Sequence, residues 1–162
     1  MLPGVNPECA YAPQSNESVI EIAQQNDRFI PFCNVDPRAM ANSADAPLGD
    51  LLRHCLDRGC KGIGEVCASL PLLDPLVQNL LKHAQDVGFP LTFHIAPHMR
   101  GFYGLYDDPG LPQLERCLER FPELRFLGHS QPFWAQIAGL EMPGERAGYP
   151  KHRVSHEPCC QN

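Results

Sequence analysis

The chain has 162 residues, of which 43% are hydrophobic and 20% are charged, a composition typical of a folded globular domain. The formal net charge of −6 argues against a nucleic-acid binder, and no apolar run reaches the roughly 18 residues that a membrane span needs. The N-terminus lacks the charged and apolar regions of a signal peptide. We therefore expect a cytoplasmic protein that binds neither nucleic acid nor membrane.

Apolar strands alternate with amphipathic helices along the chain. In chain order we expect a strand at 1–5, a helix at 15–25, a strand at 28–35, a helix at 48–56, a strand at 61–67, a helix at 75–87, a strand at 90–95, a helix at 114–121, a strand at 124–130 and a helix at 132–140. Asp74-Pro75 predicts a helix N-terminus, and Gly59 and Gly88 predict left-handed helix stops.

The spacing of these elements predicts an α/β fold. Strands recur about every 30 residues with a helix between them, which indicates βαβ units and a parallel sheet. An open doubly wound sheet and a (β/α)8 barrel both satisfy the right-handed crossover rule. Because neither a Gly-rich phosphate-binding turn nor a ribose-binding acid is present, we predict part of a (β/α)8 TIM barrel with about five parallel strands.

Eight cysteines raise the alternative of a secreted disulfide framework. Cys33 and Cys67 lie in or beside strand-like runs, and Cys55 and Cys117 lie on the apolar faces of predicted helices. Free thiols at such positions pack as small hydrophobic groups. We therefore expect reduced cysteines at these four positions.

Three polar residues fall at or near the carboxyl ends of consecutive predicted strands: Glu65, His94 and His129. Parallel barrel strands open on one face there, where barrel enzymes place their catalytic groups. Two imidazoles and a carboxylate can hold Zn²⁺ or a similar divalent ion. His98 and Arg100 follow the third of these strands and are candidates for contacting a substrate anion. The alternatives are hydrogen-bonded structural histidines, and a Glu65 that pairs only with a neighbouring side chain.

Several sequence runs resemble the amidohydrolase-related family of metal-dependent hydrolases and decarboxylases, which are built on a distorted TIM barrel. These runs are NPECAYAPQSNE, RFIPFCNVDPR, GCKGIGEVC, PLTFHI, YGLYDDPGLPQLE and FPELRFLGHSQPFWAQI. The strand that ends in Phe-His and the later strand that ends in Gly-His-Ser are the more specific features.

The resemblance implies that His94 is a metal ligand, that His129 binds a second metal or polarises the substrate, and that Glu65 is a bridging or supporting carboxylate. It further implies that residues 1–149 form strands two to six of the family barrel, and that 150–162 form a divergent, disordered tail. The implied function is hydrolysis or decarboxylation of a small organic substrate.

The family's His-x-His pair of strand one and aspartate of strand eight have no counterpart here, so we expect this chain alone to bind Zn²⁺ weakly or not at all. Two other interpretations stay open. One is a catalytically incomplete fragment that associates with copies of itself through open sheet edges. The other is a small doubly wound binding protein without a metal.

Overall fold

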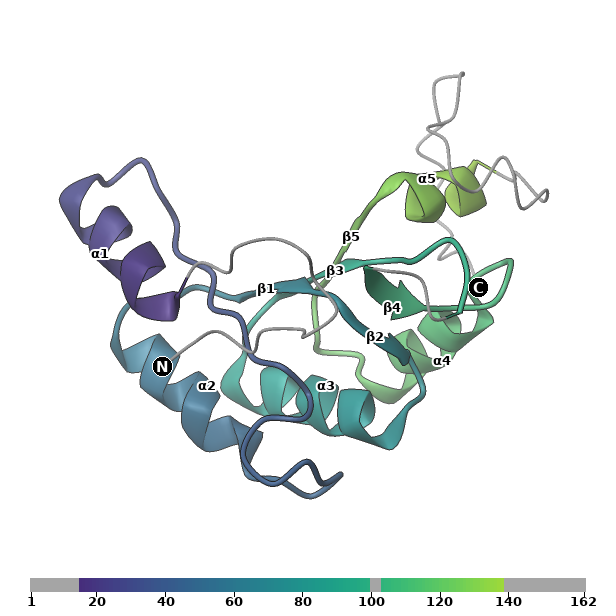
Figure 1. Cartoon of the computed structure of the whole chain (residues 1–162), viewed down its shortest axis with the longest axis horizontal. Coiled ribbons are helices and arrows are strands. Elements are labelled where there is room, and N and C mark those ends of the chain that lie inside the picture. The colour runs from purple at the N-terminus through teal and green to yellow at the C-terminus, as the bar shows by residue number, and fades with distance from the viewer. Residues whose placement is uncertain (1–14, 100–102, 139–162) are drawn as a thin grey trace.

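The computed structural model describes residues 15–99 and 103–138, and these form an α/β structure (Figure 1). In chain order the elements are α1 Asn16–Gln25, α2 Leu48–Asp57, β1 Ile63–Val66, β2 Ala68–Pro71, α3 Pro75–Val87, β3 Leu91–His94, β4 Gly104–Tyr106, α4 Pro112–Arg120, β5 Phe126–His129 and α5 Gln131–Ile137. Each predicted helix is confirmed within a few residues, as are the three predicted strands at 61–67, 90–95 and 124–130. The predicted strand at 1–5 and the tail at 150–162 lie outside the described residues.

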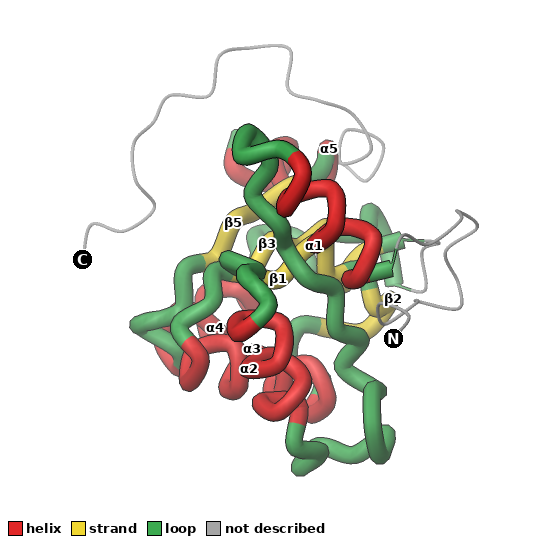
Figure 2. The backbone as a smooth tube through the Cα atoms, turned by 90° about the vertical axis from the view of Figure 1, so that its left-hand side faces the viewer, coloured by secondary structure: helices red, strands yellow, loops and turns green. Residues whose placement is uncertain are grey.

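The main sheet is parallel, with the strand order β1-β3-β5. A parallel bridge between Cys33 and Ile63 brings the 28–35 run to the other edge of β1. Neighbours in this sheet are therefore consecutive units of the chain. The connecting helices α2, α3 and α4 lie on the same side of the strands, whereas α1 and α5 lie at opposite ends of the molecule (Figures 1 and 2). The described strands form no closed barrel.

The predicted strand at 28–35 is wrong, because this run forms no strand and contributes only an isolated bridge at Cys33. Its pairing with β1 is limited to hydrogen bonds such as Lys61 N–H to the Pro31 carbonyl (2.8 Å) and Cys33 N–H to the Gly62 carbonyl (2.9 Å). Pro31 has no N–H to donate to a ladder. Before it, Phe29 and Ile30 are 57% and 69% exposed, so no burial holds that part of the run against the sheet.

A second, two-stranded parallel sheet of β2 and β4 was not predicted. It extends beyond the carboxyl ends of the main strands, and a bridge between Ile95 and Leu105 joins it to β3. Both strands are short, and Pro71 and Gly104 at their ends are residues that normally interrupt a strand pattern. This small sheet carries the segment that starts at Tyr103 across the end of β3.

The core lies between the main sheet and helices α2 to α4. Local signals fix α3: Asp74 accepts a hydrogen bond from Leu76 N–H (2.9 Å), and Gly88 ends the helix with φ of 78°. The fully buried residues of helices and sheet include Leu52, Val77, Leu80, Leu81, Ile63, Leu91 and Phe93. Each contributes about 1.5–3 kcal/mol by leaving water. Leu56 on α2 and Leu118 on α4 are both 40% exposed.

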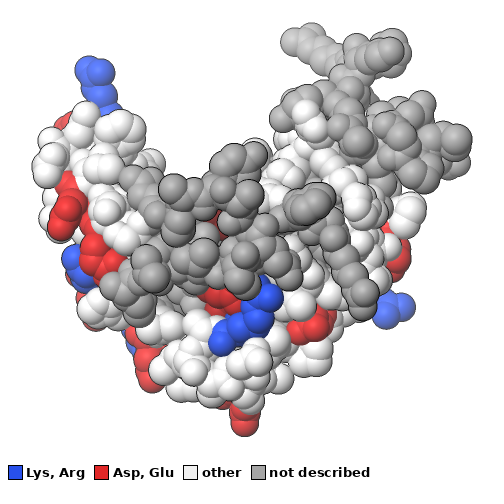
Figure 3. All heavy atoms as spheres, viewed as in Figure 1, with Lys and Arg blue, Asp and Glu red and all other residues white. Residues whose placement is uncertain are grey.

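Within residues 15–99 and 103–138, no helix has the length and apolar character that crossing a membrane requires. Charged side chains of both signs are interspersed over the face of the molecule shown in Figure 3. The five described cysteines are free thiols; Cys33, Cys55, Cys60 and Cys117 are buried and Cys67 is partly buried.

Candidate metal centre

Three side chains that the sequence singled out meet at the carboxyl ends of the main strands. Glu65 comes from β1, His94 is the last residue of β3, and His129 is the last residue of β5. His94 and His129 are partners in the parallel register, so their side chains project from the same face of the sheet. One ligand atom of each residue lies within 4.8 Å of the others. The predicted convergence of these residues is therefore present in the fold.

The Glu65 carboxylate is the centre of this group. Its Oε1 lies 2.7 Å from His94 Nδ1 and 3.3 Å from His129 Nε2, and the two imidazole rings are 5.4 Å apart. Burial would raise the pKa of Glu65, but hydrogen bonds from His94 and Tyr103, with the two histidines, outweigh it and hold the pKa below its usual 4.5. Glu65 is therefore an anion at neutral pH. His129, at 53% exposed, faces solvent most openly.

Tyr103 completes the group and was not predicted from the sequence. Its hydroxyl donates to the second carboxylate oxygen, Glu65 Oε2, at 2.8 Å, and its ring meets His94 edge-on with centroids 4.6 Å apart. Burial, followed by the bond to Glu65, raises the Tyr103 pKa well above 10. The phenol therefore stays protonated and acts as a donor. The only sequence feature that could have pointed to Tyr103 is its position in the irregular run YGLYDDP.

A glycine allows Tyr103 to reach this position. Gly104 has φ of 109°, and a Cβ atom there would lie 2.7 Å from the Ala96 backbone nitrogen and 2.8 Å from the His94 carbonyl oxygen. Real Cβ atoms do not approach backbone atoms so closely. Residue 104 must therefore lack a side chain for β4 to pack on the end of β3.

The Gly-His-Ser run at the end of β5 has a physical explanation in this fold. A Cβ on Gly128 would overlap the Phe133 ring, which packs edge-on against Phe93 with centroids 5.7 Å apart. Ser130 Oγ accepts from Ile95 N–H (3.2 Å), donates to the Ile95 carbonyl (3.1 Å) and caps α5. These contacts fix both sides of His129 against β3.

Two asparagines hold Glu65 from its other side. Asn34 Nδ2 donates to the Glu65 carbonyl at 3.3 Å. Asn16 in turn donates to the Asn34 carbonyl (3.0 Å) and accepts from its N–H (2.8 Å). Asn16 is 2% exposed, and its buried side-chain amide holds the Asn34 backbone through these two hydrogen bonds. Sequence periodicity gave no signal for either residue.

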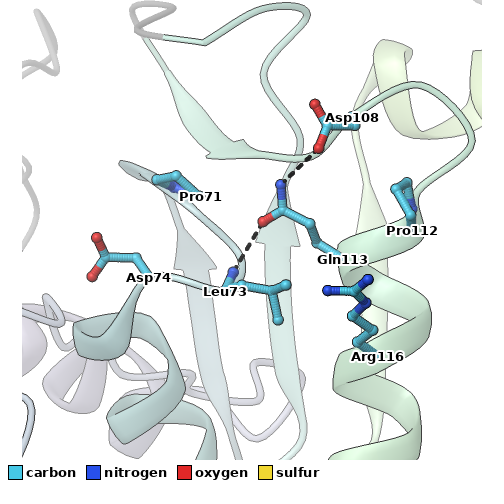
Figure 4. Close-up of a pocket in the computed structure, with 7 residues that line it drawn as sticks. All are labelled: Pro71, Leu73, Asp74, Asp108, Pro112, Gln113 and Arg116. Atoms are coloured by element: carbon cyan, nitrogen blue, oxygen red, sulfur yellow. Dashed lines mark hydrogen bonds between the residues drawn. The ribbon is translucent and has the colours of Figure 1, made fainter.

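The two predicted substrate contacts do not join the group. His98 is exposed in the loop after β3, and Arg100 lies outside the described residues. A separate pocket of about 420 Å³ lies at the end of β2 between α3 and α4 (Figure 4). Its lining residues are Pro71, Leu73, Asp74, Asp108, Pro112, Gln113 and Arg116. Gln113 spans the pocket by accepting a hydrogen bond from Leu73 N–H and donating one to Asp108. Glu65, His94 and His129 do not line this pocket.

No protein-family model, no curated protein and no solved structure matches this chain. Its function is therefore inferred from the site itself.

Proposed function

We propose that this chain carries the centre of a metal-dependent hydrolase, or related decarboxylase, of the amidohydrolase type. Glu65, His94 and His129 would hold one divalent ion, Zn²⁺ by preference, and a small organic molecule would be the substrate. The observation that carries the proposal is the convergence of one carboxylate and two imidazoles at the carboxyl ends of three neighbouring parallel strands. The free thiols of the described cysteines favour a cytoplasmic location as part of the same proposal.

The path of the chain supports a barrel wall. Consecutive strands are neighbours, and the three connecting helices lie on one side of the sheet. A doubly wound sheet would place its helices on both faces. In a barrel every helix lies outside, and the strand ends open on the catalytic face. This arrangement favours the interpretation as strands three to six of the family barrel, with the 28–35 run as the third.

The donor set fits the metal. Catalytic zinc sites commonly use three protein ligands, among them two histidines and one glutamate, and leave a position for water or substrate. The three ligand atoms are already within 4.8 Å of one another, and His129 leaves one side open. When bound, such an ion supplies Lewis-acid polarisation of a substrate oxygen and lowers the pKa of a coordinated water.

The protein's own groups prepare this chemistry. Glu65 is anionic and directs Oε1 toward both imidazoles. Tyr103 holds Oε2 and thereby sets the plane of the carboxylate, and the ring of Tyr103 limits the rotation of His94. Ser130 and Gly128 keep the strand end of His129 close to β3. His129, the most exposed of the three, is the side chain placed to meet a substrate.

Zinc titration of the full chain tests the proposal. Because the family's ligands of strands one and eight have no counterpart here, we expect weak binding of one equivalent of Zn²⁺, which dialysis against a chelator removes. Affinity should fall by at least a further tenfold in Glu65→Gln, His94→Gln and His129→Gln. His54→Gln is the matched control, because His54 is exposed on α2 and does not belong to the group of Glu65, His94 and His129. Equal affinity in all four variants would reject the metal centre.

Activity is tested separately, with the zinc-loaded chain and a panel of small lactones, amides and aromatic carboxylic acids. Product release that chelation abolishes and that zinc restores supports the proposed reaction class. Turnover that persists without metal would contradict the mechanism. Zinc binding without turnover on any substrate would favour the non-catalytic alternative.

A further inference from the structure

A second group of potential ligands lies in the core, away from the strand ends. Cys33 comes from the 28–35 run, Cys55 from α2 and Cys60 from the turn between α2 and β1. Their three sulfur atoms lie within 4.8 Å of one another, and none of these residues is more than 1% exposed. Sequence patterns explained Cys33 and Cys55 as separate apolar residues, but they did not predict that three thiols would meet.

Backbone hydrogen bonds fix all three cysteines. Cys33 N–H donates to the Gly62 carbonyl (2.9 Å), and its thiol donates to the same oxygen (3.4 Å). Cys60 N–H donates to the Cys55 carbonyl (3.0 Å), which closes the turn after α2 and returns Cys60 to the side of Cys55. The Asn16 amide contacts the Cys55 sulfur at 4.0 Å. Little rearrangement is therefore needed for the sulfurs to share a ligand.

The surroundings shift the pKa values of the three thiols in different directions. The neighbouring Cys33 thiol lowers the pKa of Cys55, whereas Cys55, followed by burial, raises the pKa of Cys33. Burial raises the pKa of Cys60 to about 11. The Arg58 guanidinium favours the thiolates of Cys55 and Cys60, whereas Glu17, which pairs with Arg58 at 3.5 Å, opposes the thiolate of Cys55. Cys55 is thus the sulfur best placed to lose its proton first.

We propose that Cys33, Cys55 and Cys60 form a buried three-sulfur site for a soft monovalent metal ion, Cu(I). Three sulfurs in a plane around an ion at about 2.3 Å lie about 4 Å apart, and the three sulfurs in the fold lie within 4.8 Å of one another. Thiolates select soft ions such as Cu(I) and Zn²⁺. Structural Zn²⁺ takes four ligands, and among the described residues no fourth Cys, His, Asp or Glu joins this group.

The binding step conserves charge and needs no redox partner. Cu(I) enters as Cu(I), sulfur–copper bonds replace two S–H bonds, and two protons leave to solvent. The third sulfur coordinates as a thiol, which leaves the site with a charge of −1 beside Arg58. The bound ion would join the 28–35 run, α2 and the turn between α2 and β1, and would thereby stabilise the fold.

An anaerobic competition assay with a coloured Cu(I) chelator tests the site. The protein used is the full chain carrying Cys9→Ser, Cys159→Ser and Cys160→Ser. These substitutions remove the cysteines outside the described residues. We expect one equivalent of tightly held Cu(I), and at least a tenfold loss of affinity in Cys33→Ser, Cys55→Ser or Cys60→Ser. Cys117→Ser is the matched control, because Cys117 is equally buried but bonds to Gln78. His94→Gln with His129→Gln should also leave the Cu(I) affinity unchanged, which separates this site from the zinc centre.

Two measurements on the chain with its core cysteines intact keep the test independent of how the serine variants fold. X-ray absorption should show three sulfur neighbours, and one equivalent of Cu(I) should raise the melting temperature. Two-sulfur or nitrogen coordination, affinity lost equally in the Cys117 control, or tight four-coordinate Zn²⁺ with no Cu(I) bound would each overturn the proposal.

Discussion

The close packing of β4 against the end of β3 gives a quantitative prediction for Gly104→Ala. The new Cβ would lie 2.7 Å from Ala96 N and 2.8 Å from the His94 carbonyl, and the φ of 109° is itself unfavourable for a residue with a side chain. The conformational cost is about 1–2 kcal/mol. Overpacking against backbone that cannot rotate away adds about 1–3 kcal/mol. We therefore expect a loss of roughly 2–5 kcal/mol in the free energy of unfolding.

Gly88→Ala is the matched control for this prediction. Gly88 also has a positive φ, of 78°, but nothing lies within 4 Å of a Cβ placed there, so alanine should incur only the conformational cost. Urea unfolding monitored by circular dichroism measures both variants. The difference between them isolates the steric contribution. If Gly104→Ala costs no more than Gly88→Ala, the close approach of β4 to His94 is not a feature of the folded protein.

Three further substitutions test the site and the fold around it. Tyr103→Phe removes the hydrogen bond to Glu65 and should lower the free energy of unfolding by about 1–3 kcal/mol, measured by urea titration at pH 7. Leu80→Ala empties a fully buried position and should cost about 2–5 kcal/mol in the same assay. Burial, with the nearby negative charge of Asp108, raises the pKa of Asp107 above its usual 3.8 despite three backbone hydrogen bonds. The protonated form of Asp107 therefore stabilises the folded protein below pH 3.8, and this contribution is lost as the pH rises through the folded-state pKa. In Asp107→Asn that loss should disappear from the pH profile of unfolding, whereas the exposed Asp57→Asn should keep it.

The parts of the fold that local chemistry determines were predictable. The N-cap of Asp74, the first-turn proline and the αL glycine at position 88 define α3 within a few residues, and the structure reproduces its bounds. The convergence of Glu65, His94 and His129 was predictable for a topological reason. The carboxyl ends of parallel strands share one face of a sheet, so residues at those ends are neighbours whatever their separation in sequence.

The features that the sequence did not predict depend on contacts between distant residues, which local sequence patterns do not reveal. Tyr103 reaches Glu65 across 38 residues, through a sheet whose strands are only three and four residues long. The three-cysteine group depends on the turn after α2, which returns Cys60 to Cys55, and hydrophobic periodicity treats each cysteine alone. The 28–35 run was wrongly predicted as a strand, because its apolar residues outweighed Pro31 and their pattern does not reveal that Phe29 and Ile30 are exposed.

The order of strands in the main sheet also bears on how the fold is assembled. Each pairing in this sheet joins residues about 30 positions apart in the chain: the isolated bridge of Cys33 with Ile63, and the strand pairs Ile63 with Leu91 and Leu91 with Phe126. A strand therefore needs only the unit that precedes it in order to dock, and loop-closure entropy stays the same at each step. For a parallel sheet this is a low contact order, which favours rapid folding and allows the sheet to grow in the direction of synthesis.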